Sequence, residues 1–192
     1  MSKIWFTSDN HFSHKAIRGL CPNTRRGETP EEMDELMIAQ WQKQVAPEDT
    51  VYLLGDVFFC NAERAVSIMD RLPGHKQLIY GNHDKVIKSN SHLRSKFESV
   101  NDYREVKIEG TDVCMFHYPQ LEWNKCHYGA YQLFGHVHGS MDSHPFTSKY
   151  RTMDVGIDSR PYDSNQDKEM FSLWSWEEVR GILKDRELLG HH

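Results

Sequence analysis

The stretch LIYGNHDKV, from Leu78 to Val86, joins an apolar run to an abrupt polar end. Its first residues have the continuous apolar pattern of a buried strand, and Gly81 ends the run. An amide, an imidazole and a carboxylate then follow in succession, at Asn82, His83 and Asp84. Side chains of these kinds bind divalent metals or transfer protons. The stretch therefore predicts a strand whose end carries a chemical site.

The same arrangement occurs at four other places in the chain. Each is an apolar run that ends in polar residues: KIWFTSDNH (3–11), DTVYLLGDVF (49–58), DVCMFHYP (112–119) and YQLFGHVHG (131–139). Runs this continuously apolar are typical of strands that are covered on both faces. In open α/β sheets, ligands bind beyond the carboxyl ends of the strands. We therefore expect the five polar ends to form one site.

Helical patterns separate the first strands and close the chain. They are TPEEMDELMIAQWQKQVAP (29–47), NAERAVSIMDRLPG (61–74) and SWEEVRGILKDREL (175–188). The first has an apolar stripe along one face, formed by Met33, Leu36, Met37, Trp41 and Val45. Asn61 is placed to cap the second helix, and Ser175 with Glu178 has the pattern of a capping box at the start of the third.

The second half of the chain contains further strand patterns. Residues 104–117 predict a hairpin that turns at Gly110, and TMDVGID (152–158) and EMFSLWS (169–175) predict two late strands. Strands that first alternate with helices and then form hairpins predict an α/β sandwich with mixed sheets. A length of 192 residues is enough for one well-buried core, so we expect a single domain over residues 1–190.

Composition excludes several classes of protein. A mean hydropathy of -0.71 and the lack of a long apolar run argue against a transmembrane helix. The N-terminus enters a strand pattern with no signal peptide, so we expect a cytoplasmic protein with no membrane partner. A net charge of -5 gives no overall basic field for long nucleic acid. The four cysteines have no CxxC spacing and are expected to be reduced, and His191 and His192 resemble a purification tag.

The polar strand ends supply a mixed set of oxygen and nitrogen ligands. The seven candidates are Asp9, His11, Asp56, Asn82, His117, His136 and His138. Side chains two residues apart on an extended segment share one side, as in DNH and in GHVH. Such a set suits two divalent first-row ions, with Mn²⁺ as the first candidate and Fe, Zn or Ni as alternatives. Two such ions outweigh the charge of the two carboxylates, so the site would attract phosphate.

The ordered series DNH, GD, GNHD, H and GHVH resembles that of the calcineurin-like metallophosphoesterase superfamily, and it extends over residues 9 to 138. The chain is particularly similar to short members without a cap, from bacteria and phages, whose first motif has the form of DNHFSH. The resemblance implies a four-layer αββα sandwich with two mixed β-sheets. It also implies hydrolysis of phosphate esters at a dinuclear metal site by a bridging hydroxide.

The resemblance also assigns roles to individual residues. One ion would be held by Asp9, His11, Asp56 and His138. The other would be held by Asp56, Asn82, His117 and His136, so that Asp56 bridges the two ions and is a catalytic residue with His83. The His83 imidazole would contact the phosphate and help the leaving oxygen to depart.

One position departs from the pattern of the superfamily. Many relatives extend the second motif to GDxxD, and the later aspartate orients the catalytic histidine. This chain has Phe59 there, which leaves the tautomer and the pKa of His83 without that control. Asp84 is the available substitute for this orienting role, and the alternative is that Asp84 caps the helix that follows.

Four residues are candidates for contact with the substrate. His14 lies three residues after His11, and Arg25 and Arg26 occupy a polar loop where bidentate recognition of phosphate is possible. Tyr118 follows His117 and has a ring on which a nucleobase can stack. The simpler interpretation of each is a solvated loop residue or a packing aromatic. Asp154 and Asp158 are interpreted as structural.

The sequence leads to a metal-dependent phosphodiesterase acting on small nucleotide-type substrates or oligonucleotides. A chain of this length has little room for a cap, which favours small or extended diesters. An oligonucleotide would need a local basic edge, for which the candidates are Arg18, Arg25, Arg26, Lys149, Arg151 and Arg160. The alternative activity is that of a phosphomonoesterase on nucleotides or proteins. The alternative from another class is a metal-binding scaffold like the retromer subunit, which has lost the catalytic histidine, whereas His83 is present here.

Overall fold

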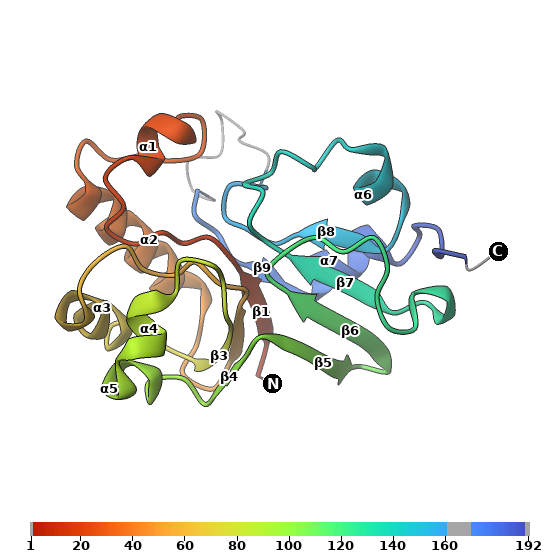
Figure 1. Ribbon diagram of the computed structural model, residues 1–192, viewed down its shortest axis with the longest axis horizontal. Helices are drawn as coiled ribbons and strands as arrows, with labels where there is room; N and C mark the ends of the chain where they lie inside the picture. The colour runs from red at the N-terminus through yellow and green to blue at the C-terminus, as the bar shows by residue number, and fades with distance from the viewer. Residues whose placement is uncertain (1, 161–169, 191–192) are drawn as a thin grey trace.

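The computed structural model describes residues 2–160 and 170–190. Its strands are β1 (Ile4–Thr7), β2 (Thr50–Leu53), β3 (His75–Ile79), β4 (Ser99–Asn101), β5 (Tyr103–Ile108), β6 (Thr111–Phe116), β7 (Tyr131–Phe134), β8 (Thr152–Asp154) and β9 (Trp174–Ser175). Its helices are α1 (Ile17–Leu20), α2 (Pro30–Gln44), α3 (Ala62–Met69), α4 (Lys85–Ser89), α5 (Ser91–Arg94), the 3-10 helix η1 (Cys126–Tyr128), α6 (Pro145–Lys149) and α7 (Trp176–Leu183). Figure 1 shows this arrangement.

The strands form two mixed sheets. The first has the order β4-β3-β2-β1-β9, in which only β9 is antiparallel to its neighbour. The second has the order β5-β6-β7-β8, in which β5 and β6 form the predicted hairpin and the other pairs are parallel. The predicted α/β sandwich with two mixed sheets is therefore confirmed.

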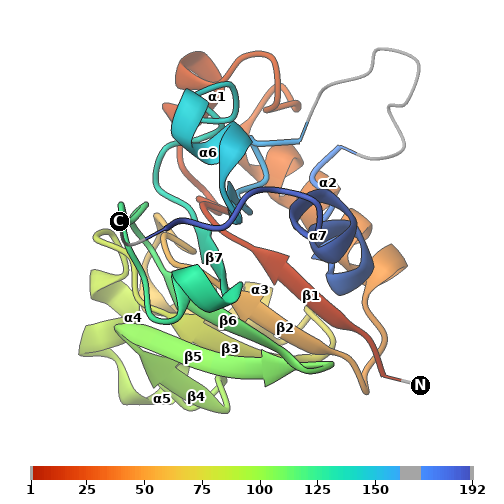
Figure 2. The same cartoon turned by 90° about the vertical axis from the view of Figure 1, so that its right-hand side faces the viewer.

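Alternate side chains of the first sheet enter two separate cores, because successive residues of a strand face opposite sides. In β1, Trp5 faces the helices and Phe6 faces the second sheet. The outer core also contains the buried faces of α2, α3, α4 and α5, which lie on one side of the sheet in Figure 1. The inner core lies between the sheets, and Trp176 and Val179 of α7 complete it beside β1 (Figure 2).

The outer face of the second sheet has a thin cover. Cys114 of β6 packs there with Trp123, Cys126 and Ala130, and Phe146 of α6 lies against this small cluster. A 3-10 helix and a five-residue α-helix thus take the place of a full helical layer on this side. The four-layer order is kept, but the two outer layers are unequal.

Most of the predicted helix signals are present. Asn61 caps α3 by accepting a hydrogen bond from the Arg64 backbone N–H, and the capping box at α7 is complete. In α2, however, Leu36 is 45% exposed and Ile38 is fully buried, so the predicted apolar stripe was wrong at Leu36. The helix buries Met33, Met37 and Trp41 in the outer core, because residues four apart lie on one face. Ile38 is buried beside this row.

The last predicted strand is shorter than expected. Only Trp174 and Ser175 pair with β1, while the first residue of the predicted segment, Glu169, lies outside the described residues, as do His191 and His192. All four cysteines are free thiols. No helix within residues 2–160 and 170–190 is long and apolar enough to cross a bilayer.

The capping box of α7 gives a test of the fold. The Ser175 hydroxyl accepts from the Glu178 N–H at 3.2 Å, and the Glu178 carboxylate accepts from the Ser175 N–H at 2.7 Å. We expect Ser175→Ala to lower the free energy of unfolding by about 1 kcal/mol in urea denaturation, since a helix N–H loses its partner. Ser67→Ala, an exposed position inside α3, is the matched control and should be neutral or slightly stabilising. Equal stability of both variants would contradict the capping role.

Candidate metal centre

The polar strand ends meet at the seam between the two sheets. Asp9 and His11 follow β1, Asp56 follows β2 and Asn82 follows β3, all in the first sheet. His117 follows β6, and His136 and His138 follow β7, in the second sheet. The sequence prediction that these ends form one site agrees with this placement.

Tight turns present most of these side chains. The backbone is left-handed at Asp9, His11, Asp56, His136 and His138, with φ between 49° and 71°. This conformation is uncommon for residues with a side chain, although aspartate and histidine adopt it more readily than most, and such strain gathers at functional sites. The turns are tied together, because the Asp9 N–H donates to the Gly55 carbonyl and the His11 N–H donates to the Asp56 carbonyl, both at 3.0 Å.

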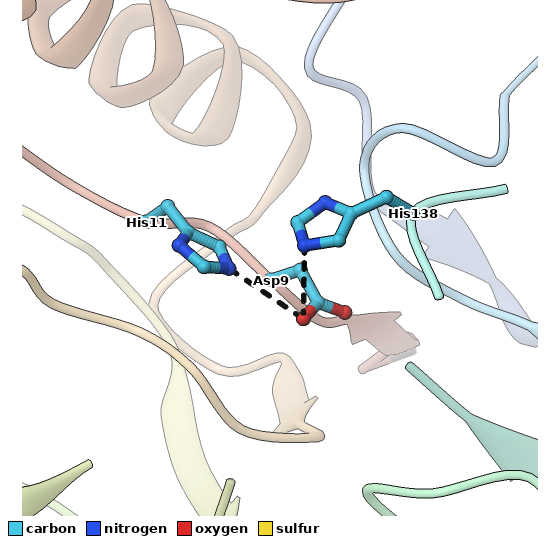
Figure 3. Close-up of side chains that lie close together, drawn as sticks. All are labelled: Asp9, His11 and His138. Atoms are coloured by element: carbon cyan, nitrogen blue, oxygen red, sulfur yellow. Dashed lines mark ion pairs between the residues drawn. The ribbon is translucent and has the colours of Figure 1, made fainter. Parts of the chain in front are cut away.

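Asp9, His11 and His138 form the first group of converging side chains (Figure 3). The Asp9 Oδ1 atom lies 3.6 Å from His11 Nε2 and 3.9 Å from His138 Nε2. Both Asp9 and His11 are buried. Within the part of the chain that the structure describes, Asp9 Oδ1 and both ring nitrogens of His11 have no hydrogen-bond partner. Buried polar atoms are rarely left without a hydrogen-bond partner, so this group of side chains fits a site where a cation binds between them.

Asp158 sets the orientation of His138. The His138 Nδ1–H donates to Asp158 Oδ2 at 2.7 Å, which turns Nε2 toward Asp9. Burial lowers the pKa of His138, but the hydrogen bonds to Asp158 and Cys21 and the charge of Asp9 outweigh burial and raise it to about 10. Asp158 had been interpreted as structural. Its contact with a candidate ligand is of the kind that orients a metal-binding histidine.

Asp56, His117 and His136 form the second group. The His117 Nδ1–H donates to the Leu54 carbonyl at 2.6 Å, so its Nε2 carries the lone pair. That nitrogen lies 3.4 Å from Asp56 Oδ2 and 3.0 Å from Asn82 Oδ1. Burial lowers the pKa of His117, but the hydrogen bond to Asp56 and the charges of Asp9 and Asp56 raise it overall, so the oxygens around this nitrogen favour a cation there, either a proton or a metal ion. His136 is exposed, and its ring centroid lies 5.2 Å from that of His117.

Asp56 lies between the two groups. Its Oδ2 atom is 4.0 Å from His11 Nε2 in the first group and 3.4 Å from His117 Nε2 in the second. Its Oδ1 atom accepts a hydrogen bond from the His83 backbone N–H at 2.8 Å. Burial raises the pKa of Asp56, but the hydrogen bonds from His117 and His83 lower it overall. One carboxylate therefore faces both candidate ion positions and the loop of His83.

Asp84 holds the loops of Asp56 and Asn82 together. Its buried carboxylate accepts hydrogen bonds from the backbone N–H groups of Asp56, Val57 and Gly81, at 3.0, 2.9 and 2.8 Å. It makes no capping hydrogen bond to α4, and it contacts the backbone rather than the His83 ring. Both predicted roles of Asp84 were therefore wrong. Sequence alone could not show that two of its partners are the N–H groups of Asp56 and Val57, at the end of another strand.

Arg25 lies behind the centre instead of facing a substrate. The residue is 3% exposed, and its Nε and Nη2 atoms donate to the two oxygens of Asp158 at 2.8 and 2.6 Å. The same side chain donates to the backbone carbonyls of Asp9 and Asn10. The prediction of Arg25 as a substrate contact was therefore wrong, because the partner that engages it is distant in sequence. Arg26 is exposed.

Phe59, at the position where relatives have an aspartate, makes ring contacts in place of a hydrogen bond. It stacks on His11 with centroids 4.7 Å apart and lies 4.8 Å from His83 and 4.0 Å from His14. His83 is exposed and His14 is half-buried. In residues 2–160 and 170–190, the His83 ring has no hydrogen-bond partner. Tyr118 is 38% exposed, and its ring meets that of His136 edge-on at 4.6 Å.

Gly81 provides a test of how closely the loops approach one another. A Cβ atom at this position would overlap the Asp56 carboxylate and come within 2.6 Å of its backbone nitrogen. We expect Gly81→Ala to destabilise the protein by about 1–3 kcal/mol in urea denaturation and to displace Asp56. Gly181→Ala is the matched control, since its Cβ would meet nothing within 4 Å and the position is inside α7, where alanine stabilises by about 0.5–1 kcal/mol. A change in the free energy of unfolding with the same sign for both variants would contradict this geometry.

Comparison with known proteins gives relatives across most of the chain. The gene 66 protein of Mycobacterium phage L5 is 30% identical over 190 residues, which cover 83% of this chain and 88% of that protein. An uncharacterized protein of Methanocaldococcus jannaschii is 29% identical over 162 residues, covering 82% and 83%. No family model matches.

A solved structure shares the fold. It is a protein of unknown function from Aquifex aeolicus, with a TM-score of 0.72 and 22% identity, covering 95% of this chain and 100% of that one. The motif series of this chain lies at one edge of two mixed sheets, as that series requires. The chain therefore belongs to the same family as the gene 66 protein of Mycobacterium phage L5.

Proposed function

We propose that this protein is a hydrolase of phosphate esters that uses two divalent metal ions. The observation that carries the proposal is the convergence of two groups of carboxylate and imidazole side chains, which the Asp56 carboxylate connects. Two ions would satisfy the buried atoms of Asp9 and His11 and would separate His117 Nε2 from its two oxygen neighbours. Nitrogen and oxygen ligands of this kind suit Mn²⁺, with Fe, Zn or Ni as alternatives.

The first ion would be held by Asp9, His11, Asp56 and His138, and the second by Asp56, Asn82, His117 and His136. When bound, the two ions would act as Lewis acids toward phosphoryl oxygens and lower the pKa of an attacking water. Asp158 and the Leu54 carbonyl accept hydrogen bonds from Nδ1 of His138 and His117, so the Nε2 atoms of both rings are directed toward the ion positions.

His83 is the residue that we assign to proton transfer to the leaving oxygen. It is exposed, and its backbone N–H is bonded to Asp56 Oδ1, which keeps it beside the centre. Its ring contacts the ring of Phe59 at 4.8 Å, so it is positioned by packing instead of by a carboxylate. A general acid must reach the leaving oxygen, and this edge of the centre is open to an ester.

The charge balance favours a diester over a monoester. Two ions, two carboxylates and a bridging hydroxide would leave a charge of +1 at the centre, and Arg25 adds none toward a substrate because Asp158 neutralises it. A diester carries one negative charge, whereas an ionised monoester carries two and commonly needs additional cations. A monoesterase remains the alternative activity, and an interaction scaffold is the alternative of another class.

The contacts of the predicted basic edge favour small substrates over oligonucleotides. Arg18 donates to the Gly27 carbonyl, Arg151 donates to the carbonyls of Lys184 and Arg186, and Arg160 pairs with Glu178. Lys149 pairs with Glu187. Side chains engaged within the protein are less available for the phosphate contacts that dominate affinity for nucleic acid. We therefore favour a small diester, with nucleotide-type compounds as the class to examine.

The activity is tested with two model esters. We expect Mn²⁺-dependent hydrolysis of bis-p-nitrophenyl phosphate to exceed that of p-nitrophenyl phosphate. His83→Ala should lower kcat by roughly 100-fold or more, because a positioned acid is lost. His92→Ala, an exposed histidine on α5, is the matched control and should retain full activity. A preference for the monoester would indicate the phosphatase, and bound metal without turnover of either ester would favour the scaffold.

Metal binding is tested by its dependence on pH. The pKa of His138 in the metal-free protein is raised to about 10, so at pH 7.5 a proton occupies the nitrogen that the ion needs. The protonated form stabilises the metal-free fold fully below about pH 6.5, and this stabilisation is lost as the pH rises through about 10. We therefore expect Mn²⁺ affinity to rise with pH between 7 and 9. Loss of the proton from His138 should raise the Mn²⁺ affinity by nearly tenfold per pH unit, and by no more than about tenfold.

The released proton can be counted by titration calorimetry in buffers that differ in ionisation enthalpy. Asp158→Asn is the informative variant, because it removes the carboxylate that raises the pKa of His138. It should release less than the wild-type number of protons at pH 7.5. Mn²⁺ binding that releases no proton from the wild type would contradict the assignment of His138 as a ligand.

A further inference from the structure

His14 has an imidazole that is fixed on two sides. Its Nδ1 atom accepts a hydrogen bond from the Ile17 backbone N–H at 2.9 Å, at the start of α1. Its ring meets that of Phe59 edge-on, with centroids 4.0 Å apart and an interplanar angle of 74°. Because Nδ1 accepts a hydrogen bond, the neutral ring carries its hydrogen on Nε2. His14 therefore offers one N–H donor whose direction is set by the protein.

The fixed imidazole lies at the edge of the first group. Its centroid is 5.4 Å from that of His11, and the ring of Phe59 contacts His14, His11 and His83. His14 is half-buried, so one part of it is accessible beside the centre.

Two other side chains that could donate to a bound ester, those of Arg25 and His83, are not fixed toward it in the part of the chain that the structure describes. Arg25 directs its N–H groups at Asp158 and at backbone carbonyls. No carboxylate among residues 2–160 and 170–190 fixes the ring of His83, and position 59, where the motif resemblance implies an orienting aspartate, is a phenylalanine. An ester bound at the two groups would place phosphoryl oxygens beside His11, and His14 is the neighbouring side chain with a preset N–H.

We infer that His14 donates an Nε2–H hydrogen bond to a phosphoryl oxygen of a phosphate ester bound at the metal centre. This inference rests on the proposed function and adds to it a second imidazole with a separate task. His14 keeps its proton throughout, since the bond is a hydrogen bond and no atom is transferred. The proton that the leaving oxygen takes up is left to His83. A donor held in place before binding loses little conformational entropy when the ester arrives.

Two amide variants separate this role from a purely structural one. Glutamine extends its amide to the position of Nε2 and can keep the donor, whereas asparagine reaches only the position of Nδ1 and can keep the acceptor for Ile17. We expect His14→Gln to retain kcat/KM for bis-p-nitrophenyl phosphate within a few-fold. His14→Asn should lose roughly 10- to 100-fold, the range for a hydrogen bond to a charged group. The opposite order would mean that His14 serves only to start α1, and the inference would be overturned.

A binding measurement keeps this test independent of turnover. Inorganic phosphate is titrated into the Mn²⁺-loaded protein, and His14→Asn should weaken phosphate binding by about tenfold relative to His14→Gln, with Mn²⁺ affinity unchanged. If the wild type binds phosphate but hydrolyses neither ester, the proposed function fails while the role of His14 is still decided. Equal phosphate affinities in the two variants, or no phosphate binding by the wild type, would overturn the inference.

His144 provides a matched control for both measurements. Its Nδ1 atom accepts from the Phe146 N–H at 3.2 Å at the start of α6, which is the same kind of contact that His14 makes to α1. His144 belongs to neither group of candidate ligands. His144→Asn and His144→Gln should therefore leave ester hydrolysis and phosphate binding unchanged. A loss in these variants equal to that of His14→Asn would also overturn the inference, because it would reflect helix capping alone.

Discussion

The buried carboxylate of Asp56 is the interaction on which the rest of the centre depends. One of its oxygens faces imidazoles of both groups, and the other is bonded to the backbone of His83. Its own backbone is held by Asp84, and Gly81 is packed against its side chain. A charge in so low a dielectric is stable only with strong partners, and these partners come from every neighbouring strand end. The left-handed turns, the close approach of Gly81 and the buried carboxylate of Asp84 all help to hold these partners around the charge of Asp56.

The fold and the convergence of the candidate ligands could be predicted because their signals are local. A continuous apolar run that stops at a glycine and a metal-binding side chain can be recognised within ten residues, and parallel strands bring such ends to one edge. Arg25 could not be assigned in this way, because its partner Asp158 is 133 positions away. Leu36 shows a different limit. The apolar face of an amphipathic helix is wide, so its pattern does not fix which residues at its edges are buried. Here the packing of α2 buries Ile38 and leaves Leu36 exposed.

The thin second outer layer and the phenylalanine at position 59 both depart from the pattern that the motif resemblance implies. A 3-10 helix, α6 and the end of the chain cover Cys114 with a cluster of a few residues, so most apolar burial lies on the two faces of the first sheet. At the centre, Phe59 replaces a charged contact with ring contacts to three histidines. Such contacts restrict orientation while leaving the protonation of each ring to its other neighbours.

Because the candidate ligands come from both sheets, bound ions would also join the two halves of the chain. Asp9, Asp56 and Asn82 belong to the first sheet, and His117, His136 and His138 to the second, while the chain passes from one sheet to the other between β4 and β5 and returns only at β9. Ions at this seam would act as a reversible cross-link between segments distant in sequence. The cohesion of the sandwich would then follow the free-ion concentration, since a ligand that binds only the assembled form shifts the folding equilibrium toward it.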